Sequence, residues 1–160
     1  MNGWENFFIA EVGASSALAG LVFVGISINL DRILKFPVLP GRALEAIVAL
    51  VAVLAVSSLL LVPGQSIRMI GAELLLVGLV DWAFLGGIQV CARSHVQEQY
   101  RKEYVIRIVL TELATLPFVI GGVAVLTRGE GGIYWTVPGI LISFAIALFD
   151  AWVLLIEINR

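Results

Sequence analysis

Five long apolar segments constrain the fold of this chain more than any other feature of its sequence. Crossing about 30 Å of bilayer hydrocarbon takes about 20 helical residues, and hydrophobic residues make up 60% of the 160 residues. Soluble domains contain only roughly 45–50% apolar residues. The sequence therefore predicts an all-α integral membrane protein, a single domain (residues 1–160) with five transmembrane helices over residues 7–30, 43–62, 71–92, 105–127 and 133–156.

Glycine and proline separate most of these segments, in "FPVLPGR" from Phe36, "VPGQS" from Val62 and "RGEGG" from Arg128. The third connection, "RSHVQEQYRKEY", contains neither residue, so we expect the flanking helices to continue beyond the lipid. The start "MNGWENFF" lacks the basic region of a cleaved signal peptide, which predicts that the first segment stays as an anchor.

The basic residues predict how the helices are oriented. With five spans, eight of the ten Lys and Arg residues fall on one face of the membrane, and only Arg68 and Arg128 fall on the other. Basic residues accumulate on the cytoplasmic side, so we expect the N-terminus outside and the C-terminus in the cytoplasm. The net charge of -2 and the lack of a long basic run argue against a nucleic-acid partner.

Four acidic residues within the apolar segments are the main candidates for a functional site. Asp81 lies near the middle of its segment, Glu112 and Asp150 lie about two turns from the cytoplasmic side, and Glu11 lies in the outer part. The sequence places no Lys or Arg at the depth of the first three. An unpaired charge at the bilayer centre costs about 2.5–3.5 kcal/mol or more.

These carboxyl groups have functional and structural interpretations. They can be protonated, because desolvation disfavours the charged form, they can face a water-filled cavity, or they can bind a cation. In the structural alternative, a protonated side chain donates a hydrogen bond to a neighbouring helix, to which an indole such as that of Trp82 can contribute. Asp150 has a further structural alternative, an ion pair with Arg107 or Arg93.

The first segment opens with "AEVGASSALAG", in which most side chains are small. Small residues four apart let helices approach closely, and their presence nearly all round suits a helix in the bundle centre or at a subunit interface. The alternative is a narrow path lined by hydroxyl groups. The residues that belong to one or other interpretation are Ser15, Ser16, Gly20, Ser27 and Asn29.

Motifs of other chemistry are absent from the sequence, which has no HExxH, no paired CxxC and no phosphate-binding glycine loop. His95 is expected at the surface, and Cys91 is expected to serve in packing or as an occasional lipidation site. The sequence therefore predicts no enzyme, no metal site and no cofactor.

Several stretches, "LAGLVFVGISINLDRIL", "LPGRALEAI", "LVPGQS" and "YWTVPGILISFAIALFDAWVLLIEI", resemble a family of small uncharacterised bacterial inner-membrane proteins. The resemblance implies a location in the bacterial cytoplasmic membrane and implies no activity or site.

Two functions are consistent with these observations. The first hypothesis is a small homo-oligomeric channel for protons or cations, in which Asp81, Glu112, Asp150 and Glu11 handle the ion. The second is a non-conducting regulatory or lipid-binding protein that acts through helix–helix contacts with a membrane-protein partner. In both, the chain is in contact with the lipid bilayer.

Overall fold

The protein is a bundle of long helices, seen here in a computed structural model that describes residues 3–36, 39–93, 98 and 101–156. These residues contain no strand. The elements, in order, are α1 (Glu5–Ile28), α2 (Leu30–Ile33), α3 (Leu39–Leu60), α4 (Ile67–Ala92), α5 (Arg101–Arg128), the 3-10 helix η3 (Gly129–Trp135) and α6 (Thr136–Leu155).

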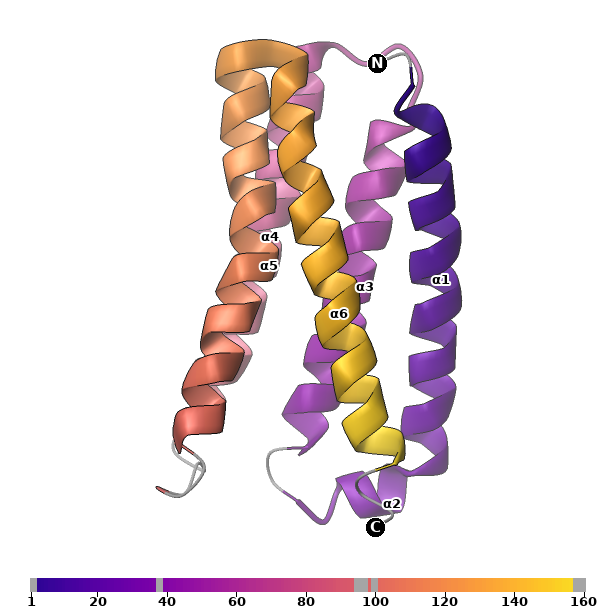
Figure 1. Ribbon diagram of the computed structural model, residues 1–160, viewed down its shortest axis with the longest axis vertical. Helices are drawn as coiled ribbons and strands as arrows, with labels where there is room; N and C mark the ends of the chain where they lie inside the picture. Colours follow the sequence, from indigo (N-terminus) through magenta and orange to yellow (C-terminus); the bar gives the residue numbers. More distant parts are fainter. Residues whose placement is uncertain (1–2, 37–38, 94–97, 99–100, 157–160) are drawn as a thin grey trace.

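Helices α1, α3 and α4 are each long and apolar enough to cross a membrane. The run Tyr104–Leu155 also qualifies and is 52 residues long, which at about 1.5 Å per residue would reach more than twice the thickness of the bilayer hydrocarbon. Figure 1 shows that this run reverses at η3, so α5 and α6 form an antiparallel hairpin. The predicted bundle of long apolar helices is confirmed, while its orientation in a membrane stays a prediction.

The helices run lengthwise between the two ends of the molecule (Figure 1). The N-terminal end contains the start of α1, the α3–α4 turn and η3, and the C-terminal end contains α2 and the ends of α4 and α6. Helix α1 packs against α3 and α6, while α4 packs against α5 and α3. Helix α1 therefore lies at one side of the bundle and not in its centre, and the other predicted alternative, a subunit interface, stays a prediction.

Glycine lies at two of the predicted turns, while one predicted helix-breaking proline lies within a helix. Gly64 and Gly129 have φ values of 75° and 78°, which L side chains rarely adopt. The Ser66 hydroxyl begins α4 by accepting a hydrogen bond from the Met69 amide at 3.3 Å. Pro40 lies in the first turn of α3, where its missing N–H costs no hydrogen bond. Helix α3 consequently begins four residues earlier than predicted.

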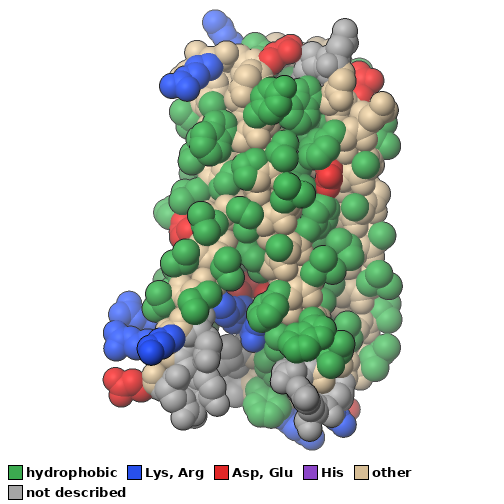
Figure 2. Space-filling view, in the orientation of Figure 1, with side chains coloured by type: hydrophobic (Ala, Val, Ile, Leu, Met, Phe, Trp, Pro, Cys, Tyr) green, Lys and Arg blue, Asp and Glu red, His purple; other side chains and the backbone are tan. Residues whose placement is uncertain are grey.

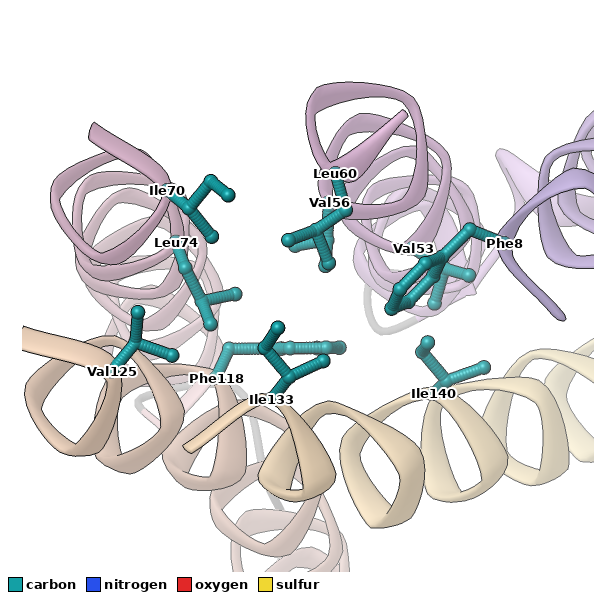
Figure 3. Close-up of a cluster of buried hydrophobic side chains, with 10 residues drawn as sticks. All are labelled: Phe8, Val53, Val56, Leu60, Ile70, Leu74, Phe118, Val125, Ile133 and Ile140. Carbon is teal, nitrogen blue, oxygen red and sulfur yellow. The ribbon is translucent and has the colours of Figure 1, made fainter. Parts of the chain in front are cut away.

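An apolar cluster fills the N-terminal half of the bundle (Figure 3). Phe8 and Phe118 are its largest buried side chains, and α1, α3, α4, α5, η3 and α6 all contribute to it. Large apolar side chains also cover the outside of the molecule, with acidic and basic groups mostly near its ends (Figure 2). Such a surface suits a hydrocarbon environment.

Glycines bring α4 and α5 unusually close together. A Cβ atom added to Gly122 would lie 2.5 Å from the Leu75 backbone nitrogen, and one added to Gly78 would lie 2.8 Å from the Val119 nitrogen. Small residues permit this approach between helices in membranes. By contrast, Gly13 and Gly20 of α1 have nothing within 4 Å of an added Cβ.

Candidate functional site

An ion-pair cluster joins α3, α5 and α6 in the C-terminal half of the bundle. The Arg42 Nε and Nη2 atoms donate hydrogen bonds to Asp150 Oδ1 at 3.0 and 2.7 Å. Arg107 donates to Glu45 Oε2, and its Nη2 lies 3.9 Å from Asp150 Oδ2. The carboxyl side chains are only 3% and 8% exposed, against 17% and 22% for the two arginines.

This cluster corrects the prediction that Asp150 lacks a basic residue at its depth. Its two cations and two anions cancel, so neither carboxylate needs a bound ion. The structural alternative for Asp150 is confirmed with Arg107 as one partner, but the closer partner is Arg42. Because α3 begins at Leu39, Arg42 lies one turn inside a helix and not in the preceding loop.

Glu45 and Arg42 are the two members of the cluster that the sequence analysis did not single out. Arg42 and Glu45 are three residues apart, so they lie on the same face of α3. That pairing of opposite charges near a helix start was the available signal. In the structure this face of α3 turns toward Arg107 and Asp150.

Asp81 of α4 is different because it has no basic partner in the described part of the chain. It is 5% exposed, and its Oδ1 atom has no hydrogen-bond partner among the described residues. It borders a cavity of about 10 Å³, whose other polar lining residues are Glu45, Thr111, Thr115 and Ser143. That volume is about the minimum that holds one water molecule.

Glu45 connects the two features, because it belongs to the ion-pair cluster and also lines the cavity beside Asp81. The structure therefore brings Asp81 and the Asp150 cluster into one polar region, called here the inner polar site and consisting of Arg42, Glu45, Asp81, Arg107, Thr111, Thr115, Ser143 and Asp150. It lies on four helices, α3, α4, α5 and α6.

A chain of hydrogen bonds between α4 and α5 also reaches this site. The Tyr104 hydroxyl donates to the Gln89 carbonyl at 2.8 Å, and Gln89 Nε2 donates to Thr111 Oγ1 at 2.7 Å. Thr115 Oγ1 donates to the Thr111 carbonyl at 3.0 Å. These bonds satisfy buried polar groups and continue the line of polar atoms from Tyr104 to the cavity.

Glu112 does not join the inner polar site. Its Oε2 atom accepts a hydrogen bond from the Trp82 indole N–H at 2.9 Å, and neither residue lines the cavity beside Asp81. This contact agrees with the structural alternative, in which an indole N–H holds an acidic group between neighbouring helices.

The remaining predicted residues lie on α1, apart from Asn29 directly after it, and none lines the cavity. The hydroxyl groups of Ser15, Ser16 and Ser27 donate to carbonyl groups of the same helix at 2.6 to 2.9 Å. The Asn29 side chain donates to the Gly25 carbonyl at 3.1 Å. Ser16, Ser27 and Gly20 are exposed on the outside of the bundle.

Glu11, the fourth predicted carboxylate, is partly buried on α1, and its Oε2 atom has no hydrogen-bond partner among the described residues. Cys91 is exposed, which argues against the packing role and leaves the lipidation site a prediction, and His95 lies outside the described residues. No group of three potential metal-ligating side chains occurs within the described ranges.

Comparisons with protein-family models, with curated proteins and with solved structures found no match to this chain. The resemblance to small bacterial inner-membrane proteins therefore stays a prediction, and a function has to be inferred from the inner polar site itself.

Proposed function

We propose that this protein is an integral membrane protein that passes protons across the bilayer, with Asp81 as the group that takes up and releases them. The observation that supports this most is the unpartnered, buried carboxyl of Asp81 beside a cavity of about 10 Å³. A buried carboxyl without a cation is stable when it binds a proton, and it becomes costly when that proton leaves.

The size of the cavity favours protons over other cations. It has room for about one water molecule, whereas a hydrated metal ion needs several. A proton needs only a short line of oxygen atoms, and the side chains of Glu45, Thr111, Thr115 and Ser143 border the same space. We therefore infer that protons are the permeating species.

Access from the C-terminal end follows the ion-pair cluster. Arg42 and Arg107 are partly exposed, and Glu45 extends from their cluster to the cavity. Figure 2 shows basic side chains set back between helices near this end. Toward the N-terminal end, the interior of the bundle is filled by the apolar cluster that contains Phe8 and Phe118. For a proton to pass from Asp81 to the N-terminal end, the helices around this cluster would have to move apart.

We further propose that the C-terminal end faces the cytoplasm, because a topology of five spans puts eight of the ten basic residues on that side. Asp81 and Asp150 are buried within one protomer, so the proposed path needs no axis between subunits. An oligomer remains compatible with it through the exposed face of α1.

The test is proton flux into proteoliposomes, followed with a trapped pH-sensitive dye. We expect Asp81→Asn to reduce the proton flux about tenfold or more, because an asparagine amide does not take up and release a proton as a carboxyl group does. Asp31→Asn is the matched control, since Asp31 is exposed, and it should conduct like the wild type. Absence of flux in the wild type, or equal flux in Asp81→Asn, would refute the proposal.

The second candidate function is non-conducting regulation of a membrane-protein partner. The observation that favours it is the open face of α1, where Gly13 and Gly20 have nothing within 4 Å of an added Cβ. Gly20→Leu should then release a co-purifying partner or dissociate a homo-oligomer, whereas Gly87→Leu, at an equally open position of α4, should not. A monomer that purifies alone in both cases would exclude this function.

A further inference from the structure

A second hollow in the molecule is separate from the cavity beside Asp81, although Gln89 and Tyr104, which line it, belong to the hydrogen-bond chain that reaches Thr111. It is a groove of about 800 Å³ between α4 and α5, within the size range of ligand sites. It shares no lining residue with the cavity beside Asp81. Its apolar walls are Ala83, Gly86 and Val90 of α4 and Val105 and Ile108 of α5.

The length of the groove matches one leaflet of a bilayer. It extends along α4 from Trp82 to Arg93 and along α5 from Arg101 to Glu112. Eleven residue steps of about 1.5 Å give about 16 Å on each helix, and half of the bilayer hydrocarbon is about 15 Å. A groove that leads from the interface to the midplane has the length of an acyl chain.

The deep end and the side of the groove also suit an acyl chain. The Trp82–Glu112 hydrogen bond closes the deep end. Val90 and Val105 on its walls are 72% and 51% exposed, so the groove is open sideways to the surroundings of the bundle. In a bilayer those surroundings are hydrocarbon, which fills such a groove in preference to water.

The mouth of the groove carries a net positive charge. Arg93 and Arg101 are exposed there, and no ion pair with either guanidinium is found among the described residues. Glu98 adds one negative charge, and Tyr104 lines the groove beside them. Two guanidinium groups at the level of the lipid headgroups are suited to a phosphate.

We propose that this groove binds one anionic phospholipid. Arg93 and Arg101 hold the phosphate of the headgroup, and one acyl chain lies along Gly86 toward the Trp82–Glu112 hydrogen bond. The chain can pass close to α4 at this point because a Cβ added to Gly86 would meet nothing within 4 Å, which means that the glycine leaves open space.

Two glycines make a matched test of the acyl chain. Gly86 lines the groove and Gly87 does not, while neither has a neighbour within 4 Å of an added Cβ. Native mass spectrometry of the detergent-solubilised full chain would measure retention of added phosphatidylglycerol. We expect Gly86→Phe to reduce retention about tenfold and Gly87→Phe to retain the lipid like the wild type. Equal retention by the two variants would overturn the proposal.

The headgroup is tested with phosphatidylcholine of the same acyl chains. We expect the wild type to retain phosphatidylglycerol about tenfold better than phosphatidylcholine, in line with a charge-assisted contact. The double variant Arg93→Gln/Arg101→Gln should lose this preference. Arg68→Gln, at the opposite end of α4, is the control and should keep it. If Gly86→Phe fails to fold, the arginine variants alone test whether the groove binds an anionic phospholipid. A wild type that retains both lipids equally would refute this proposal.

Discussion

Removing the charge of Asp150 should destabilise the bundle strongly, because two arginines depend on this carboxylate. The variant Asp150→Asn keeps the size of the side chain and leaves Arg42 and Arg107 with one carboxylate, that of Glu45, between them. Removing one partner of a buried ion pair costs about 3–5 kcal/mol. Since the arginines are 17% and 22% exposed, water can solvate them in part and reduces this cost. We therefore expect the free energy of unfolding to fall by about 3 kcal/mol.

The assay is unfolding of the protein in mixed detergent micelles, with the free energy of unfolding obtained from the helical signal. The double variant Arg42→Gln/Asp150→Asn removes one charge of each sign. It should therefore be more stable than the sum of the two single changes predicts, by about 1 kcal/mol or more. Glu112→Gln is the matched control, because the amide oxygen still accepts the Trp82 hydrogen bond, and it should cost less than about 1 kcal/mol.

Two results would refute this reasoning. A stability of Asp150→Asn equal to that of the wild type would show that Asp150 is not charged or not paired with Arg42. Strict additivity in the double variant would show that the two side chains do not interact, whatever each contributes alone.

Two further predictions concern the packing and the orientation of the helices. Gly122→Ala should lower the free energy of unfolding by about 1–3 kcal/mol through overpacking, whereas Gly13→Ala should leave it unchanged or raise it by up to about 1 kcal/mol; equal effects would contradict the close α4–α5 contact. In a Cys91→Ser background, a membrane-impermeant thiol reagent added to intact cells should label Glu130→Cys and not Asp31→Cys, and the reverse pattern would invert the proposed orientation.

Local sequence signals predicted the helices because they report on residues close in the chain. Apolar runs marked the long helices, and glycine and proline marked the turns at Gly64 and Gly129. The start of α3 was misplaced because Pro40 was read as a break, although proline fits the first turn of a helix. That error of four residues left Arg42 in a loop and hid its ion pair with Asp150.

Contacts between distant residues were not available from the sequence. Arg42 and Asp150 are 108 positions apart, and neither periodicity nor spacing indicates which helices are neighbours. For the same reason the sequence pointed to the small residues of α1 as the place of close helix contacts, whereas Gly78 and Gly122 bring α4 and α5 close together and Gly13 and Gly20 of α1 face open space. Asp81, in contrast, is buried as the sequence predicts, because its depth follows from its own segment, and it has no basic partner among the described residues.

Infrared spectroscopy of the protein in lipid vesicles tests most directly whether Asp81 exchanges a proton with water. The spectrum of the wild type should contain a C=O band of a protonated carboxylic acid that Asp81→Asn lacks and Asp31→Asn retains. We predict that this band weakens reversibly when the pH of the bath is raised. Identical spectra of the wild type and Asp81→Asn at every pH, or an Asp81 band that no change of pH affects, would contradict a role of Asp81 in proton transfer.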